Sequence, residues 1–498
     1  MLQILSLKKT VIVLISLVIS CLFVFSKLLA FNPTPVPITQ SCTFFKWFDP
    51  NTNDEEGRTF LKNCSSCHMT YYKEWINDKH SMSQNNPFFL SVYSGTTTEN
   101  LKSNVYPGFR LDHPEQNGNC ALCHNPEAAL LDTSKDVDIR TVKNTNGISC
   151  DFCHKIESID QNPLKKGISG INIVRAIKGK RFISNIQDLE LADPTNWKGF
   201  KDIRFGPIKD PLEIKEISDV EELRYNSLYK TSLICAKCHD GLNGNVPIYS
   251  TFTEWANSPA ARRGVQCQHC HMPPRNNANS IVDNPDIKSK LRPYHQIHSH
   301  SFLTEDPHEL RKKYVDLKIE TKKQNGILTV KIVVENNNFG HSFPTGSPMR
   351  NAILLLEVKN KDGKELSLIK GPKLPNYAGN LRQKPGKLFA KILEETSSEY
   401  AVLSGKSKEG IEFRKIAKDL GIPAQDWWNV FIASDRRIKP NSSDVSIYQF
   451  TVGASRDLPL QPVTITAKLF WRNTWPALAK IKHVELKEDL LIERHLTL

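Results

Sequence analysis

Five copies of the pattern Cys-x-x-Cys-His occur in the first 271 residues of the chain, and they contain ten of its twelve cysteines. Two thiols at this spacing can form thioether bonds to the vinyl groups of a porphyrin, and the adjacent histidine can bind the iron. A zinc site built from Cys-x-x-Cys pairs would not need a histidine directly after each second cysteine. The sequence therefore predicts five covalently bound c-type haems. The expected thioether cysteines are Cys64, Cys67, Cys120, Cys123, Cys150, Cys153, Cys235, Cys238, Cys267 and Cys270, and the expected proximal ligands are His68, His124, His154, His239 and His271.

The residues opposite these five histidines decide what the haems can do. A haem with histidine on both faces is coordinatively saturated and passes electrons, whereas an open face can bind and reduce a small molecule. The candidate distal ligands are His80, His113, His300 and His341, with His298 and His295 as further candidates. His80 is expected on a helix that leaves the first motif, and His341 is expected on a turn.

Four good distal candidates for five haems leave one sixth ligand unassigned. A second histidine of the cluster between residues 295 and 300 could fill this place. The thioethers of Met82, Met272 and Met349 are alternative soft ligands, although packing is the more common role of a methionine. Any catalysis is expected at haem, because the sequence has no phosphate-binding glycine loop, metalloprotease helix or serine nucleophile motif.

The N-terminus predicts export. Lys8 and Lys9 precede an uncharged apolar run over residues 11–25, which is long for a signal peptide and short for a membrane span. We expect residues 1–31 to be a signal peptide or a signal-anchor, with retention as an anchor favoured over cleavage and over lipidation at Cys21. Residues 32–42 are proline-rich and predict a stiff tether. The protein is then expected on the periplasmic or cell-surface side, attached to a membrane.

The chain is predicted to be an α+β protein with two main domains. Residues 43–309 contain every haem motif and are expected to be mainly helical or coil, with an extra structural element in the long gap between the third and fourth motifs. Residues 310–498 are expected to form an immunoglobulin-like β-sandwich, with strands near 327–335, 352–358, 366–369, 445–452 and 463–470 and a helical insertion near 406–420. Asp362-Gly363 predicts a hairpin turn.

Composition and charge fit this interpretation. Apolar residues make up only 39% of the 498 residues, and the large flat haems would supply the missing core. The formal net charge of +13 would be largely offset by haem propionates. No basic run is interleaved with aromatic residues, so a nucleic-acid partner is not expected.

The motifs and their flanks resemble the exported multihaem cytochromes of the cytochrome c-554-like class. The resemblance rests on Tyr72–Trp75 followed by His80, on the runs 120–126 and 146–154, and above all on Phe252–Ser258 followed by Gly264–Pro273. The segments Gly340–Gly346 and Asp435–Pro440 resemble the β-sandwich that many such proteins carry. The resemblance implies electron transfer outside the cytoplasm and, in a minority of relatives, a reductase.

The sequence departs from the pattern of this class at two places. Ser258-Pro259 stands after the second tryptophan where a histidine would be expected, and no histidine lies between His154 and His239. The unassigned sixth ligand is therefore expected at the third or fourth haem.

The sequence thus favours an electron carrier that links a membrane-side donor to an extracytoplasmic acceptor through mostly bis-histidine haems. Its expected partners are redox proteins and a membrane, and association into oligomers is left open. One alternative is an oxidoreductase that reduces a small oxyanion or a peroxide at one five-coordinate haem. Another is an electron-conducting structural subunit of a larger complex or filament.

Overall fold

The computed structural model describes residue 64 and residues 67–131, 136–142, 147–174, 176–178, 181–183, 200–211, 221–283, 289–302, 307–337, 339–396, 408–452 and 462–498. All of them lie in one compact unit, Phe48–Leu498. The predicted signal segment 1–31, the tether 32–42 and Cys42 lie outside the described residues. Within the described ranges, no helix is long and apolar enough to cross a bilayer.

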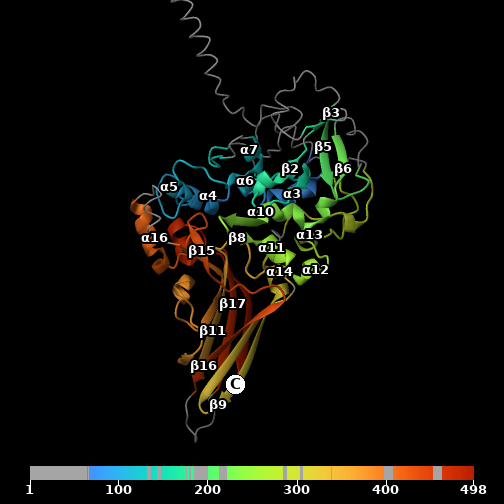
Figure 1. Cartoon of the computed structure of the whole chain (residues 1–498). Coiled ribbons are helices and arrows are strands. Elements are labelled where there is room, and N and C mark those ends of the chain that lie inside the picture. The colour runs from blue at the N-terminus through green and yellow to red at the C-terminus, as the bar shows by residue number, and fades with distance from the viewer. Residues whose placement is uncertain are drawn as a thin grey trace, which may run out of the picture. The chain divides into compact units, whose positions relative to one another are not determined.

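The part of the chain that carries the motifs is built from short helices (Figure 1). Its α-helices are α3 (Met69–Ile76), α4 (Pro87–Ser94), α5 (Phe109–Asp112), α6 (Ala121–His124), α7 (Pro126–Leu131), α8 (Cys150–His154), α10 (Ala236–His239), α11 (Thr251–Ala256), α12 (Pro259–Arg262) and α13 (Cys267–His271). Its 3-10 helices are η1 (Gly167–Gly170), η4 (Ser227–Lys230), η5 (Ser232–Cys235) and η6 (Tyr294–Gln296). Helices this short are not stable alone, so they depend on packing within the unit.

The long gap between the third and fourth motifs contains β-structure. Strand β1 (Ile156–Ile159) pairs with β2 (Ile171–Ile173), and a four-stranded sheet has the order β4-β3-β5-β6. The bounds of this sheet are β3 (Ala176–Lys178), β4 (Arg181–Ile183), β5 (Phe200–Gly206) and β6 (Glu221–Tyr225). Just after the fourth motif, β7 (Asp240–Asn243) and β8 (Val246–Ser250) form a hairpin.

The C-terminal part is a sandwich of two four-stranded antiparallel sheets, which makes the fold α+β as predicted. The strand orders are β12-β16-β10-β9 and β13-β11-β17-β18. The bounds are β9 (Val315–Gln324), β10 (Ile327–Asn336), β11 (Asn351–Asn360), β12 (Leu368–Lys370), β13 (Gly386–Phe389), β16 (Ser442–Thr451), β17 (Val463–Arg472) and β18 (Glu488–Thr497). A separate ribbon pairs β14 (Lys391–Glu395) with β15 (Val430–Asp435). The helices of this part are α14 (Pro307–Tyr314), η7 (Asn376–Leu381), α16 (Lys408–Leu420) and α17 (Pro476–Lys482).

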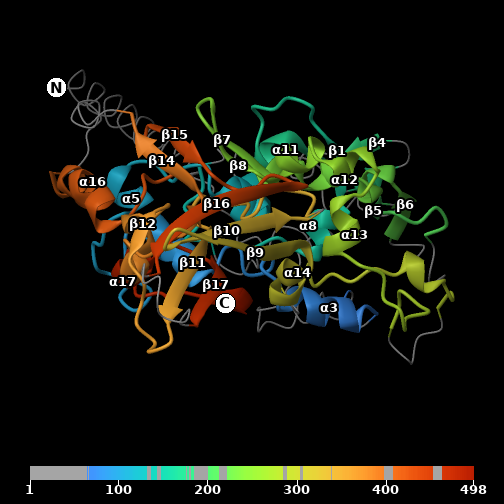
Figure 2. The same ribbon diagram turned by 90° about the horizontal axis from the view of Figure 1, so that it is seen from below.

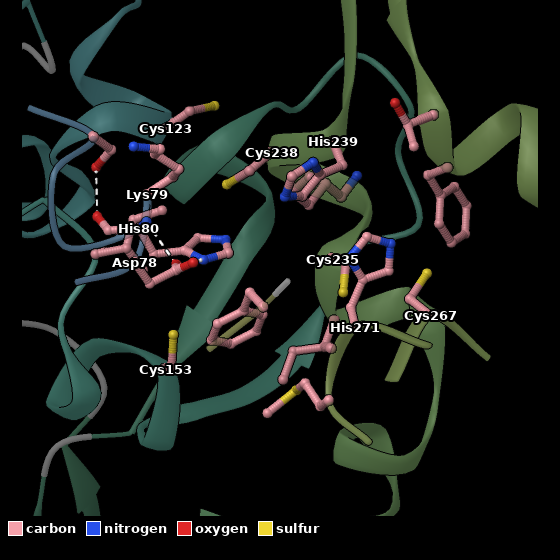
Figure 3. A pocket seen from close by; sticks show the side chains of 18 of the residues that line it. Asp78, Lys79, His80, Cys123, Cys153, Cys235, Cys238, His239, Cys267 and His271 are labelled. Atoms are coloured by element: carbon pink, nitrogen blue, oxygen red, sulfur yellow. Dashed lines mark hydrogen bonds and ion pairs between the residues drawn. The ribbon is translucent and has the colours of Figure 1, made fainter. Parts of the chain in front are cut away.

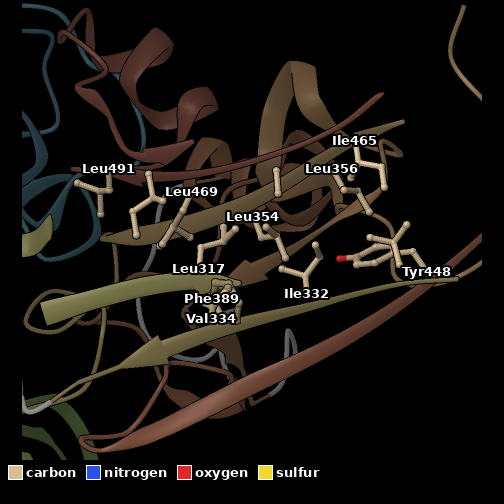
Figure 4. Packing of buried hydrophobic residues seen from close by; sticks show 14 of the residues in the cluster. Leu317, Ile332, Val334, Leu354, Leu356, Phe389, Tyr448, Ile465, Leu469 and Leu491 are labelled. Atoms are coloured by element: carbon tan, nitrogen blue, oxygen red, sulfur yellow. The ribbon is translucent and has the colours of Figure 1, made fainter. Parts of the chain in front are cut away.

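Alternation along the strands places the core between the two sheets. In β10 the side chains of Leu328, Val330, Ile332 and Val334 are fully buried, while the residues between them on the first half of the strand are more exposed. They pack against residues of the facing sheet such as Leu354 (Figure 4). The apolar face of each sheet is therefore covered by the other sheet.

The predicted hairpin at Asp362-Gly363 forms, but it is short. Gly363 has a φ of 77°, and Leu366 donates a backbone hydrogen bond to Val358 at 2.8 Å. Beyond this turn, β12 pairs with β16 in the opposite sheet rather than with β11. The turn therefore transfers the chain from one sheet to the other.

Buried side chains connect the sandwich to the motif-bearing part. Lys391 in β14 donates to the carbonyls of Pro247 and Ile248 in β8 at 2.7 and 3.1 Å. Lys482, at the end of α17, donates to three carbonyls of the segment 91–105 at 2.6 to 3.1 Å. These bonds hold the later half of the chain against the earlier half.

A third connection joins α16 to α5, which lie side by side (Figures 1 and 2). Asp112 at the end of α5 is an ion-pair partner of Arg414 in α16 at 3.0 Å. The indole N–H groups of Trp427 and Trp428 both donate to the other oxygen of Asp112 at 2.8 Å. One buried carboxylate thus secures three side chains of the C-terminal part.

Candidate haem-binding cavity

All five motifs open onto one connected cavity. Its volume is about 3170 Å³, and its lining includes all ten motif cysteines and all five motif histidines. A pocket for a single drug-sized ligand is typically about 300–1,000 Å³. The cavity is therefore large enough for several bulky groups. Figure 3 shows one part of the lining, where His80, Cys123, Cys235, Cys238 and His239 surround the same opening.

The motifs adopt a common local structure. The third and fifth motifs lie wholly within α8 and α13, and the histidines of the second and fourth end α6 and α10. In the first two motifs the backbone N–H of the histidine donates to the carbonyl of the first cysteine, at 2.8 Å for His68 and Cys64 and at 2.9 Å for His124 and Cys120. Ser149 caps the helix of the third motif by accepting from the N–H of Phe152. The turn brings both thiols and the imidazole to one side, as thioether attachment requires.

Three of the motif histidines have one ring nitrogen secured by the backbone. The Nδ1 atoms of His68, His124 and His154 lie 3.0, 2.9 and 2.8 Å from the carbonyls of Ile281, Ser83 and Phe205. A carbonyl can only accept, so Nδ1 is the protonated donor in each ring. Nε2 then keeps its lone pair, which is the arrangement usual for a metal-binding histidine.

The structure brings three motif histidines opposite histidines from distant parts of the chain. The ring centres of His154 and His300 are 6.3 Å apart, and those of His271 and His341 are 6.5 Å apart. The centres of His239 and His80 are 6.0 Å apart. A metal–imidazole bond of about 2.0 Å and a nitrogen about 1 Å from its ring centre give about 6 Å between two rings that share one metal. The spacing therefore fits a pair of axial ligands.

The facing histidines also have Nδ1 hydrogen-bonded. Nδ1 of His300 lies 3.1 Å from the carbonyl of His298, and Nδ1 of His341 lies 3.1 Å from the carbonyl of Ser342. Nδ1 of His80 donates to the carboxylate of Asp78 at 2.7 Å. In all three rings Nε2 is left available to a metal.

Burial keeps several of these rings neutral. Desolvation lowers the pKa of His300 and of His239 to about 3, and it lowers the pKa of His271 to about 4. Nearby histidines add to the effect, since His80 lowers the pKa of His239 further. Neutral imidazole is the form that binds a metal, so the fold presents these rings ready for ligation.

The remaining candidates differ in their surroundings. His298 is half-buried, lines the cavity and has Nδ1 2.7 Å from the carbonyl of Met272. His113 is the C-terminal cap of α5 and lies 5.1 Å from the ring of Phe109. His295 is exposed in η6, although it too borders the cavity. Met272 and Met349 line the cavity, whereas Met82 is 38% exposed.

The expectation that the third or fourth motif would lack a facing ligand is not what the structure shows. His154 faces His300 and His239 faces His80. Neither His300 nor His80 lies between His154 and His239 in the sequence. The ring of His68 lies 5.9 Å from that of Tyr71, and the ring of His124 lies 3.9 Å from that of Phe89. Within the described residues, the first and second motifs are therefore the ones for which no facing histidine is found at this spacing.

Sequence reasoning missed the residues that orient the imidazoles. Most of them are backbone carbonyls, which leave no signal in the sequence. Asp78 is the exception, because its carboxylate is two residues before His80 and is buried. The spacing Asp-x-His is a usable signal for a carboxylate that supports a metal-binding histidine.

The cavity, the five attachment motifs and the facing histidines define a multihaem c-type cytochrome with a C-terminal β-sandwich. Residues 63–155 match the family model described as cytochrome c554 and c-prime. The crystal structure of a penta-heme cytochrome c552 from Thermochromatium tepidum matches 87% of this chain and 97% of that chain, with a TM-score of 0.55 and 18% identity. This likeness shows a shared fold.

Two other comparisons add nothing to the assignment. A family 123 glycoside hydrolase from Clostridium perfringens overlaps 37% of this chain and 27% of that chain, with 12% identity and a TM-score of 0.13. No curated protein matches the sequence.

Proposed function

We propose that this protein is an exported pentahaem electron carrier with mostly bis-histidine haems. The observation that carries the proposal is the set of facing histidines, His154 with His300, His239 with His80 and His271 with His341. Covalently bound haem supplies a reversible one-electron couple, and histidine on both faces leaves no position for a substrate. Three such sites in one cavity favour transfer over catalysis.

The surrounding residues would support rapid transfer in two ways. Nδ1 hydrogen bonds fix the orientation of the rings, so little rearrangement is needed when the charge on the iron changes. Cysteines of different motifs also lie next to one another, Cys123 beside Cys238 and Cys235 beside Cys267. The second and fourth attachment sites are therefore neighbours, as are the fourth and fifth.

For the first and second motifs we propose ligands from the remaining candidates. His298 is held by the carbonyl of Met272 in the manner of the facing histidines, and His113 borders the cavity near Phe109. His295 is exposed and is the weaker candidate. The proposal also includes export through residues 1–31, attachment to a membrane and redox proteins as partners.

The test is the coordination state of the irons in the full-length, haem-loaded protein. Electron paramagnetic resonance of the oxidised protein should show low-spin signals from bis-histidine haems, and the reduced protein should bind little carbon monoxide. The single variants His80→Ala, His300→Ala and His341→Ala should each convert one haem to high-spin and add one carbon monoxide site per chain. A wild-type spectrum that is wholly high-spin would refute the proposal.

The reductase alternative predicts a different result in the same measurements. One native high-spin haem that shifts its spectrum with cyanide or nitrite, and that survives in all three alanine variants, would assign catalysis to the first or second motif. A protein inert to both ligands would exclude the reductase.

A further inference from the structure

Two Glu-Trp dipeptides occupy equivalent places in the chain. Glu74-Trp75 lies in α3, after the first motif, and Glu254-Trp255 lies in α11, after the fourth motif. Each dipeptide is followed later in the sequence by another motif of the cavity.

The two tryptophans make the same contact. Nε1 of Trp75 donates to the carbonyl of Ile148 at 2.8 Å, and Nε1 of Trp255 donates to the carbonyl of Val265 at 2.8 Å. Both acceptors stand two residues before the first cysteine of a motif, the third and the fifth. Each acceptor also follows a glycine with a left-handed backbone, Gly147 with a φ of 61° and Gly264 with a φ of 75°. Each indole thus fixes the backbone that leads into a proximal histidine.

The first glutamate secures the other side of the same site. Oε2 of Glu74 accepts the backbone N–H of His300 at 2.7 Å, and Oε1 accepts from Arg275 at 2.7 Å. His300 is the residue that faces His154 of the third motif. Trp75 therefore fixes the backbone that leads to His154, and Glu74 fixes the backbone of His300, which faces His154.

The second glutamate does the same for the fifth motif. Oε2 of Glu254 accepts the backbone N–H of Ser342, next to His341, at 3.1 Å, and the hydroxyl of Thr345 at 2.7 Å. Oε1 accepts from Arg437 at 2.5 Å. His341 faces His271. The three sequence runs around residues 252–258, 340–346 and 435–440 meet at this one carboxylate.

We propose that Glu74 and Glu254 are positioning residues, each of which holds the distal histidine of one haem in place with the help of an arginine. The inference rests on the proposed function, since it takes His300 and His341 as axial ligands. Both carboxylates are only 10% exposed, and their arginines are 14% and 7% exposed. A charged hydrogen bond in such surroundings is stronger than a neutral one, and loss of one partner leaves the other charge uncompensated.

A positioning role differs from general support of the fold in that each glutamate should affect one haem and leave the other unchanged. Glu254 should control His341 without affecting the haem of the third motif, and Glu74 should control His300 without affecting the haem of the fifth. Each variant is therefore the matched control for the other, because the two sites share geometry but not residues.

The experiment measures how fast each haem of the reduced, full-length holoprotein binds carbon monoxide. Carbon monoxide can enter a bis-histidine site only when the distal histidine leaves, so the rate reports how firmly that histidine is held. His341→Ala and His300→Ala identify the spectrum of each adduct. Glu254→Ala should accelerate binding at the His341 site by about 10- to 100-fold, as expected for the loss of a hydrogen bond to a charged group, with the His300 site unchanged. Glu74→Ala should give the reverse.

The conservative variants and the double variants complete the test. Glu254→Gln keeps an acceptor for Ser342 and should fall between the wild type and Glu254→Ala, even if the alanine variant loads haem poorly. Adding Glu254→Ala to His341→Ala should change nothing further at that site. If His341→Ala opens no site, the proposed function fails at this haem. If it opens one but Glu254→Ala and Glu254→Gln both bind carbon monoxide at the wild-type rate, the positioning role is refuted, as it is if both sites respond equally.

Discussion

Lys482 gives the fold a pH dependence that one substitution should remove. Its side chain is completely buried, and its Nζ donates to the carbonyls of Ser91, Thr96 and Val105. Burial lowers the pKa of Lys482 from 10.5 to about 7. Between these two values the unfolded chain binds one more proton than the folded chain, so the free energy of unfolding rises with pH across this window. Below about pH 7 both states are protonated and the contribution is constant.

The size of the effect follows from the linkage. One proton corresponds to about 1.4 kcal/mol per pH unit, so Lys482 should add about 3 kcal/mol of stability between pH 7.5 and pH 9.5. Lys482→Met should lack this slope. Urea unfolding followed by circular dichroism, at several pH values, gives the difference between wild type and variant. Lys480→Met, at an exposed position of the same helix, is the control and should retain the wild-type slope. Parallel curves for wild type and Lys482→Met would show that Lys482 keeps an ordinary pKa, and the reasoning would be wrong.

Two other predictions concern buried carboxylates. Asp78→Asn should raise the reduction potential of one haem, because His80 would lose the carboxylate that accepts from its Nδ1 at 2.7 Å and would stabilise oxidised iron less. Spectroelectrochemical titration measures the potentials, and an unchanged set of potentials would contradict this prediction. Asp112→Ala should lower the free energy of unfolding by about 3 to 5 kcal/mol, because the buried Arg414 would lose this ion-pair partner. Urea unfolding measures the loss. A change below about 1 kcal/mol would show that Glu395 alone compensates the charge of Arg414.

The motif residues that line the cavity, and much of the sandwich, could be picked out from the sequence because their signals are local. A Cys-x-x-Cys-His pattern is read within one helical turn, and central strands such as β10 and β17 alternate regularly. The edge strands β9 and β18 were not predicted. In β9 the second half of the strand, Ile319–Gln324, is rich in lysine and mostly exposed, as is common where an edge strand must avoid pairing with other chains.

The pairing of histidines could not be read from the sequence. His80 follows the first motif but faces His239 of the fourth motif. His300 follows the fifth motif but faces His154 of the third motif. Closeness in the sequence does not predict which histidines face each other. The motif helices are too short to place the motifs in the cavity in their sequence order. The third and fourth motifs therefore seemed to lack partners that the fold supplies from elsewhere.

The position of His341 has a consequence for how the protein matures. His271 and both thiols of its motif are synthesised before the sandwich, whereas His341 and Arg437, the ion-pair partner of Glu254, belong to the C-terminal part. With His341 as the proposed distal ligand, the fifth site would be completed only when the later half of the chain has folded and docked. A change from high-spin to low-spin iron at this site would mark that docking, and it would let the last step of assembly be timed in a spectrometer.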